Sequence, residues 1–231
     1  MQDKALRWGI LGCSWIAPMA MIKPSKSVCK AEIYAIAARD QNKAEVYANK
    51  HGIPVVHDSY DALLSDRNID AVYNPLPNSL HKKWTIAALQ AGKHVLVEKP
   101  FASNATEAQD IIKVSEETGC MVVEAFHYRF HPFVRRIKEQ VDKLPDLQNV
   151  DVEFCIKVFS KSDIRYNWQL AGGACMDTGS YTLNMLRYLV EPRYSIHCTS
   201  ANARTKPHFH KEIDVDMEAD FELRGDANTA T

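Results

Sequence analysis

Short apolar runs alternate with helical stretches over the first half of the chain. The apolar runs are rich in Val, Ile and Ala, and they lack the polar alternation of strands that have one solvated face. A parallel sheet covered by helices requires such strands, because both of their faces are buried. We therefore expect a doubly wound α/β domain. The predicted strands span 6–11, 32–38, 55–57, 71–74, 94–98 and 121–126, and the predicted helices span a stretch after Gly12, 43–50, 61–65, 80–90 and 105–117.

The pattern changes after Phe126. Apolar positions now recur with a period of two in three segments, as in strands with one solvated face, and with helical spacing in two others. Period-two strands that follow a parallel unit predict a second, α+β domain with an open, mostly antiparallel sheet. Because the chain stops directly after the last of these strands, we expect this sheet to be truncated at its C-terminal end. The predicted strands span 150–159, 194–202 and 213–223, and the predicted helices span 132–141 and 174–189.

Composition is that of a globular protein with packed cores. Of the 231 residues, 46% are hydrophobic and 25% charged, which is enough apolar surface to offset the entropy of ordering the chain. Basic side chains number 28 and acidic ones 29, so bulk charge attracts neither nucleic acid nor an anionic membrane. No stretch approaches the ~20 apolar residues of a membrane-spanning helix, and the N-terminus lacks a signal-peptide core. We expect a cytoplasmic protein with a small-molecule partner.

Cysteine and histidine positions give no metal signature. The six cysteines stand singly, without the close pairs of zinc ribbons, redox motifs or disulfide frameworks. His208 and His210 flank Phe209, so they would share one face of a strand, but no third ligand follows nearby. We therefore expect solvated histidines and no bound metal.

A glycine-rich turn follows the first predicted strand and opens a helix. It spans residues 9–17 and reads GILGCSWIA. In this context such turns bind a dinucleotide pyrophosphate, because free N–H groups and the helix dipole face the anion. Gly12 would supply the tight turn, and Ser14 stands where the fingerprint has its middle glycine. A plain βα turn of a flavodoxin-like protein remains the alternative from this segment alone.

The end of the second predicted strand bears on which dinucleotide would bind. A carboxylate at this place binds the ribose 2′-hydroxyl of NAD, whereas an arginine accommodates the 2′-phosphate of NADP. The segment here is Ala37-Ala38-Arg39-Asp40, and Arg39 can make a bidentate contact with a phosphate, which favours NADP. Asp40 keeps NAD possible, and a solvated Arg39–Asp40 pair is the structural alternative.

Three further segments stand in order behind the glycine turn. They read NPLPNSLH from residue 74, GKHVLVEKP from residue 92 and GGACMDTGSY from residue 172. Together with the glycine turn they resemble the glucose-fructose oxidoreductase, inositol dehydrogenase and MocA-like (Gfo/Idh/MocA) family of dehydrogenases over nearly the whole chain. Tyr181 stands where many members have histidine, and it resembles the branch of dimeric dihydrodiol dehydrogenase and xylose dehydrogenase. The resemblance implies an NAD(P)-binding Rossmann domain over 1–126 and a substrate and oligomerisation domain over 127–231.

The resemblance also implies roles for individual residues. It places Lys99 between the nicotinamide ribose and the substrate hydroxyl, and it implies a cis bond before Pro100. Asp177 and Tyr181 are four residues apart, so a helix presents both on one face. We assign Tyr181 as the acid/base, because a nearby lysine ammonium stabilises a phenolate, and Asp177 as the residue that orients the substrate.

Other residues are expected in the crevice. His81 could instead cap the following helix, and the aromatic residues of the substrate loop could serve only in packing. The predicted substrate-binding residues are Arg165, Tyr166 and Trp168. The predicted cofactor-binding residues are Gly9, Gly12, Ser14, Trp15, Ile16, Ala38, Arg39, Asn78, His81, Glu98 and Lys99.

The predicted function is a dehydrogenase that uses NADP, with NAD possible, to oxidise a secondary alcohol of a sugar, polyol or cyclic diol, or to reduce the matching carbonyl. Two alternatives stay open. One is a truncated nucleotide-binding remnant with little or no activity, and the other is an NAD-dependent glycosidase of the same family. A homodimer is expected if the second domain is complete.

Overall fold

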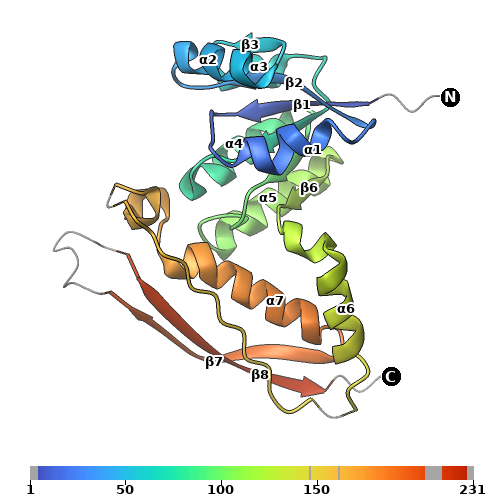
Figure 1. Ribbon diagram of the computed structural model, residues 1–231, viewed down its shortest axis with the longest axis vertical. Helices are drawn as coiled ribbons and strands as arrows, with labels where there is room; N and C mark the ends of the chain where they lie inside the picture. The colour runs from blue at the N-terminus through green and yellow to red at the C-terminus, as the bar shows by residue number, and fades with distance from the viewer. Residues whose placement is uncertain (1–4, 146, 161, 206–214, 228–231) are drawn as a thin grey trace. The chain divides into compact units, whose positions relative to one another are not determined.

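The computed structural model describes residues 5–145, 147–160, 162–205 and 215–227. The chain divides into two compact units, Met1–Ala125 and Phe126–Thr231 (Figure 1), and each unit is described by itself. Within the described ranges, no helix is both long enough and apolar enough to cross a membrane.

The first unit contains a six-stranded sheet in the order β3-β2-β1-β4-β5-β6. Every neighbouring pair in it is parallel. The order runs outward in one direction from β1 and in the other from β4, which is the doubly wound arrangement of dinucleotide-binding domains. The predicted fold class of this unit is confirmed. The strands are β1 (Leu6–Leu11), β2 (Ala31–Ala37), β3 (Val55–His57), β4 (Ala71–Asn74), β5 (His94–Val97) and β6 (Val122–Glu124).

Local side-chain chemistry sets where the intervening helices begin. The side-chain oxygens of Asp40, Ser59 and Asn104 each accept a hydrogen bond from the backbone N–H three residues on, at 3.1, 3.1 and 2.9 Å. Gly119 follows the last of these helices in a left-handed conformation with φ of 67°. The helices are α1 (Lys23–Ser25) after a π-helical turn at Pro18–Ile22, α2 (Gln41–His51), α3 (Tyr60–Ser65), α4 (His81–Gln90) and α5 (Ala105–Thr118).

Both faces of the parallel sheet are buried. Ile10 of β1 packs with Ile36 and Tyr73 in a core that includes residues of the π-helical turn and α2. The next residue, Leu11, packs in a separate core with residues of α3, α4 and α5. Successive residues of a strand point to opposite faces, so each strand of the sheet centre must be apolar throughout. This is why the first-half strands lack polar alternation.

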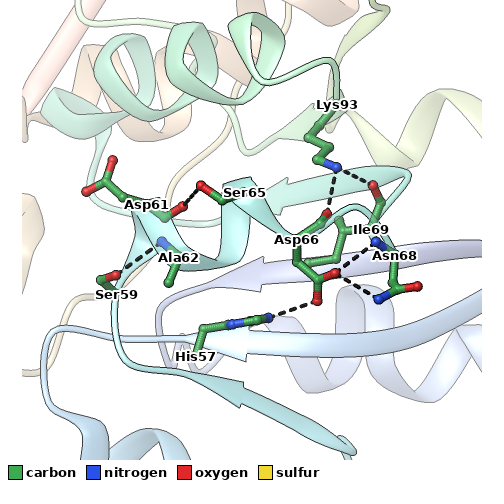
Figure 2. A network of polar contacts seen from close by, with 9 residues as sticks. All are labelled: His57, Ser59, Asp61, Ala62, Ser65, Asp66, Asn68, Ile69 and Lys93. Carbon is green, nitrogen blue, oxygen red and sulfur yellow. Dashed lines mark hydrogen bonds and ion pairs between the residues drawn. The ribbon is translucent and has the colours of Figure 1, made fainter.

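A polar network closes the turn between α3 and β4 (Figure 2). The buried ammonium of Lys93 donates to the carbonyls of Asp66 at 2.8 Å and Ile69 at 2.7 Å. The Asp66 carboxylate accepts from the backbone N–H of Asn68 at 2.8 Å and from the ring of His57 at 3.1 Å. Burial lowers the pKa of Lys93, and the hydrogen bond from the Asn68 backbone lowers the pKa of Asp66 despite partial desolvation.

The second unit contains an antiparallel pair of strands, as its period-two pattern predicts. β7 (Tyr194–Arg204) pairs with β8 (Glu218–Ala227) along their whole lengths. The helices of this unit are α6 (Pro132–Val141) and α7 (Ser180–Val190), and a π-helical turn at Cys175–Gly179 leads directly into α7. The predicted combination of helices with antiparallel strands is confirmed.

The prediction of a strand over 150–159 is wrong, because the segment is not a strand in the structure. Its alternation supplies an apolar face, but a strand also needs a neighbour that pairs with its backbone, and no strand among the described residues does so. Phe154 and Ile156 are exposed, and Phe159 is 84% exposed. The segment instead lines one wall of a cavity of about 760 Å³ in this unit, with residues of α7 and β8 on the other walls.

The Asp66 network predicts a pH-dependent stability. Because the folded-state pKa of Asp66 is lowered, its carboxylate stabilises the fold fully above the ordinary carboxyl pKa of about 4, and this stabilisation is lost as the pH falls through the lowered pKa. We expect Asp66→Asn to lower the free energy of unfolding at neutral pH, and the gap to wild type to narrow as the pH falls below the ordinary carboxyl pKa and through the lowered one. Urea denaturation at several pH values measures this.

Asp110→Asn is the matched control. It removes an exposed carboxylate that pairs with Lys82 at 2.7 Å, and it should change stability little at any pH. A stability gap for Asp66→Asn that stays constant across the pH range would contradict the assignment.

Candidate active site

The turn after β1 has the geometry of a phosphate-binding turn. Gly12 adopts a left-handed conformation with φ of 84°, and its N–H donates to the carbonyl of Ala37 at 2.7 Å. A Cβ atom at Gly12 would lie 3.0 Å from the Leu76 side chain. Conformation and space therefore both require glycine here.

Ser14 takes over a capping role in the same turn. Its hydroxyl accepts a hydrogen bond from the N–H of Ala17 at 3.2 Å, and its carbonyl accepts from the Tyr47 hydroxyl at 2.8 Å. Ala17 is fully buried, and Trp15 is 72% exposed. The serine that replaces the middle glycine of the fingerprint therefore holds the start of the helix in place.

Arg39 and Asp40 stand at the carboxyl end of β2, beside this turn. Asp40 uses its carboxylate to cap α2 at the N–H of Lys43, and its other oxygen lies 3.6 Å from the ammonium of Lys43. Arg39 is exposed. An exposed guanidinium at this strand end is available to an anionic group that approaches the turn.

The end of β5 carries the Glu98-Lys99-Pro100 segment. The Lys99–Pro100 bond is cis, as the resemblance implies. Glu98 accepts a hydrogen bond from the hydroxyl of the fully buried Tyr73 at 2.5 Å, and its N–H donates to the carbonyl of Asn74 at 3.0 Å. This segment is thus tied to β4 at the edge where ligands of doubly wound sheets bind.

His81 and Asn74 are both 0% exposed and lie behind the same edge. The Nδ1 atom of His81 lies 2.7 Å from the carbonyl of Pro100, and its Nε2 atom lies 2.8 Å from the carbonyl of Leu76. Burial lowers the pKa of His81. The alternative in which His81 caps α4 is wrong, since no side chain caps this helix. A carbonyl lies against each ring nitrogen of His81, so neither nitrogen is placed to contact a cofactor directly. Asn78 begins the 3₁₀ turn Asn78–Leu80 in the same loop.

In the second unit, a glycine pair allows two chain segments to reach the start of the π-helical turn. Gly173 has φ of 118°, and a Cβ atom there would collide with the Asp216 carboxylate. A Cβ atom at Gly172 would collide with the backbone of Arg165. The Asp216 carboxylate accepts from the N–H of Cys175 at 2.6 Å and so caps the turn that carries Asp177.

Asp177 is held by an ion pair. Its carboxylate lies 2.6 Å from Nε of Arg165, whose Nη1 atom is 3.1 Å from Asp163. Burial opposes the charge of Arg165, but its hydrogen bonds and ion pairs with Asp177 and Asp163 more than offset this, so its pKa is raised. The geometry thus gives Arg165 a contact with Asp177, while Tyr166 is half-buried and Trp168 is 67% exposed on the same loop.

Tyr181 lies one turn after Asp177 and is surrounded by aromatic rings. The ring centroids of Phe126 and Phe154 are each 5.5 Å from that of Tyr181, and the centroid of Tyr128 is 5.9 Å away. Both Phe contacts are edge-to-face, which is a favourable geometry for aromatic pairs. Rings from two chain segments therefore fix the position of the phenol.

Three residues of this geometry were missed by sequence reasoning. Asp163 and Asp216 stand outside the quoted motifs, and no local pattern marks them. Asn74 opens one of these motifs, and a polar residue at the end of an apolar strand is the signal that could have identified it. The histidines His208 and His210 lie outside the described residues. Within the described ranges, no group of three or more His, Cys, Asp or Glu side chains is placed to hold a metal ion.

Comparisons with known proteins match both units. The model of an oxidoreductase family with an NAD-binding Rossmann fold, GFO/IDH/MocA, matches residues 6–126. The GFO/IDH/MocA C-terminal domain model matches residues 134–230.

Individual relatives point in the same direction. D-xylose 1-dehydrogenase (NADP(+)) 2 of Haloferax volcanii is 38% identical over 86% of this chain and 62% of its own length. Trans-1,2-dihydrobenzene-1,2-diol dehydrogenase of Mus musculus is 33% identical over 79% of this chain and 55% of its own. The crystal structure of KijD10, a 3-ketoreductase from Actinomadura kijaniata in complex with NADP and TDP-benzene, is 30% identical with a TM-score of 0.83, over 95% of this chain and 66% of that one. The chain thus spans less than two thirds of the length of these relatives.

The glycine pair yields a stability prediction. Gly173→Ala would force an alanine into a φ of 118° and against the Asp216 carboxylate, so we expect a loss of roughly 1–3 kcal/mol in the free energy of unfolding. Gly52→Ala is the control, because Gly52 has a positive φ of 73° with open space around it. It should cost about 1 kcal/mol. Equal losses at the two positions, measured by urea denaturation, would show that the Asp216 contact contributes nothing.

Proposed function

The chain belongs to the GFO/IDH/MocA oxidoreductase family, and on this premise we propose that it transfers a hydride between NADP and a secondary alcohol or carbonyl of a sugar, polyol or cyclic diol. The observation that carries the proposal is the left-handed turn at Gly12, which follows β1 at the switch point between β1 and β4. The relatives named above include dehydrogenases of a sugar and of a diol, which supports the substrate class.

The residues present fit a dinucleotide. The left-handed turn at Gly12 stands where doubly wound folds receive a pyrophosphate, and Arg39 is exposed beside it for a 2′-phosphate. Asp40 is engaged as the cap of α2, which favours NADP over NAD. When bound, the nicotinamide ring supplies the hydride chemistry.

The protein's own residues supply orientation and a proton relay. Asp177, held by Arg165, accepts a hydrogen bond from a substrate hydroxyl and so fixes the reacting carbon. Tyr181 accepts the hydroxyl proton at its phenolic oxygen during oxidation and returns it during reduction. The rings of Phe126 and Phe154 pack edge-to-face on the Tyr181 ring and so hold the phenol in orientation. We assign Lys99 as the partner of Tyr181 on the family resemblance, because an ammonium beside a phenolate stabilises it and so lowers the barrier to removal of the proton.

Removal of the phenolic oxygen tests this assignment. We expect Tyr181→Phe to reduce turnover of the active substrate from a panel of sugars, polyols and diols by about 10²- to 10⁴-fold, because it removes the general acid/base, while NADPH binding persists. Nicotinamide absorbance follows turnover. The control is Tyr188→Phe on the same helix, whose ring packs against the Arg129 guanidinium.

Full activity in Tyr181→Phe would rule out the proton relay. A wild-type chain that binds NADPH tightly but turns over no substrate would favour the alternative of a nucleotide-binding remnant.

Arg39 tests the choice of nucleotide. We expect Arg39→Ala to weaken NADPH binding by roughly 10- to 100-fold, because a charge-assisted contact is worth about 1.5–3 kcal/mol, and to leave NADH binding nearly unchanged. Lys50→Ala removes an equal charge from the last turn of α2 and should affect neither nucleotide. Fluorescence titration measures both affinities. An equal loss for NADPH and NADH would contradict a 2′-phosphate contact.

A further inference from the structure

His81 touches two chain segments that reach the ligand edge of the parallel sheet. One is the loop after β4, through the carbonyl of Leu76 at 2.8 Å, and the other is the turn after β5, through the carbonyl of Pro100 at 2.7 Å. A carbonyl oxygen can only accept, so each contact needs an N–H of the ring. The neutral ring donates through one nitrogen and the protonated ring through both. In either form the ring fastens at least one of the two segments.

The turn after β5 is fixed on both sides of Lys99. Before it, the N–H of Glu98 donates to the carbonyl of Asn74 at 3.0 Å. After it, Pro100 has no N–H, so its carbonyl is its only backbone hydrogen-bonding group, and His81 meets that group. The next N–H, of Phe101, donates to the carboxylate of Glu124 at 2.8 Å. Of these three contacts, the one with His81 is made to a side chain of α4.

The loop after β4 depends on the same buried cluster. The amide of Asn74 accepts from the N–H of Leu76 at 3.3 Å and donates to the hydroxyl of Thr85 in α4 at 3.1 Å. His81 adds the contact with the Leu76 carbonyl, two residues before Asn78. A histidine that only filled core volume would not need a carbonyl at each ring nitrogen, because a leucine or methionine would pack as well without desolvating polar atoms.

We propose that His81 is a positioning residue, which sets the spacing between Lys99 and the loop that carries Asn78 and thereby tunes nucleotide affinity and turnover. The effect of this role on activity rests on the proposed function. The clamp itself, which is the pair of ring contacts with Pro100 and Leu76, is a property of the first unit alone. It can therefore be tested with or without turnover.

Two substitutions separate the contacts. The side-chain amide of asparagine reaches about as far as Nδ1 of histidine, so His81→Asn keeps a donor for Pro100 and loses Leu76. Glutamine reaches about as far as Nε2, so His81→Gln keeps a donor for Leu76 and loses Pro100. Each variant gives up one of the two ring contacts and reshapes a buried side chain, so both should lower the melting temperature, which is measured for each.

The positioning role predicts functional losses that differ between the two variants by more than their melting temperatures do. We expect His81→Gln, which frees the Lys99 turn, to weaken NADPH binding and lower kcat about tenfold, and His81→Asn to change both by about twofold. Amide hydrogen exchange, measured by NMR, tests the clamp without requiring turnover. His81→Gln should speed exchange about tenfold at the Phe101 amide, and His81→Asn should do so at the Leu80 amide of the other loop.

Losses in binding and kcat that simply follow the melting temperature, with both amides changed alike in both variants, would overturn the proposal and leave His81 a core residue. A wild-type chain that fails to bind NADPH would contradict the proposed function instead. In that case the exchange pattern of the two amides still decides whether the clamp exists.

Discussion

Neighbouring residues of β1, Ile10 and Leu11, pack into two different cores, and the first unit depends on this double burial. A strand buried on both faces needs helices on both, so the chain must cross over the sheet after each strand. The crossings run outward from β1 and β4, which leaves the loops after these strands to diverge. The Gly12 turn and the loop with Asn78 lie at this divergence, and the Lys99 turn follows the neighbouring strand β5.

In the second unit, two glycines, which have no side chain, leave room for segments that are distant in the sequence to come close together. Gly172 and Gly173 leave room for the Arg165 backbone and the Asp216 carboxylate at the start of the π-helical turn. The same approach lets the Arg165 guanidinium meet Asp177 at 2.6 Å. A carboxylate with a fixed cationic neighbour is held in one orientation, as the role proposed for Asp177 requires.

Much of this could be predicted from the sequence, and the exceptions have a physical reason. The bounds of β1 and α6 were predicted correctly, because burial periodicity and an N-terminal proline are local signals. The segment 150–159 has an equally clear alternation, yet alternation describes a face and not the partner that a strand requires. The bond from Cys175 to Asp216 joins residues 41 positions apart, and no local spacing encodes it. The roles of Lys99, Asp177 and Tyr181 stay predictions.

Transfer of deuterium tests the central claim, hydride transfer by this chain, most directly. NADPH that carries deuterium at the transferred position of the nicotinamide is incubated with the chain and a panel of keto sugars and diketones, and the products are analysed by mass spectrometry. The account predicts a reduced product with deuterium on the new carbinol carbon, formed in step with oxidation of the nucleotide. Tight NADPH binding with all deuterium retained on the nucleotide, for every compound of the panel, would contradict it.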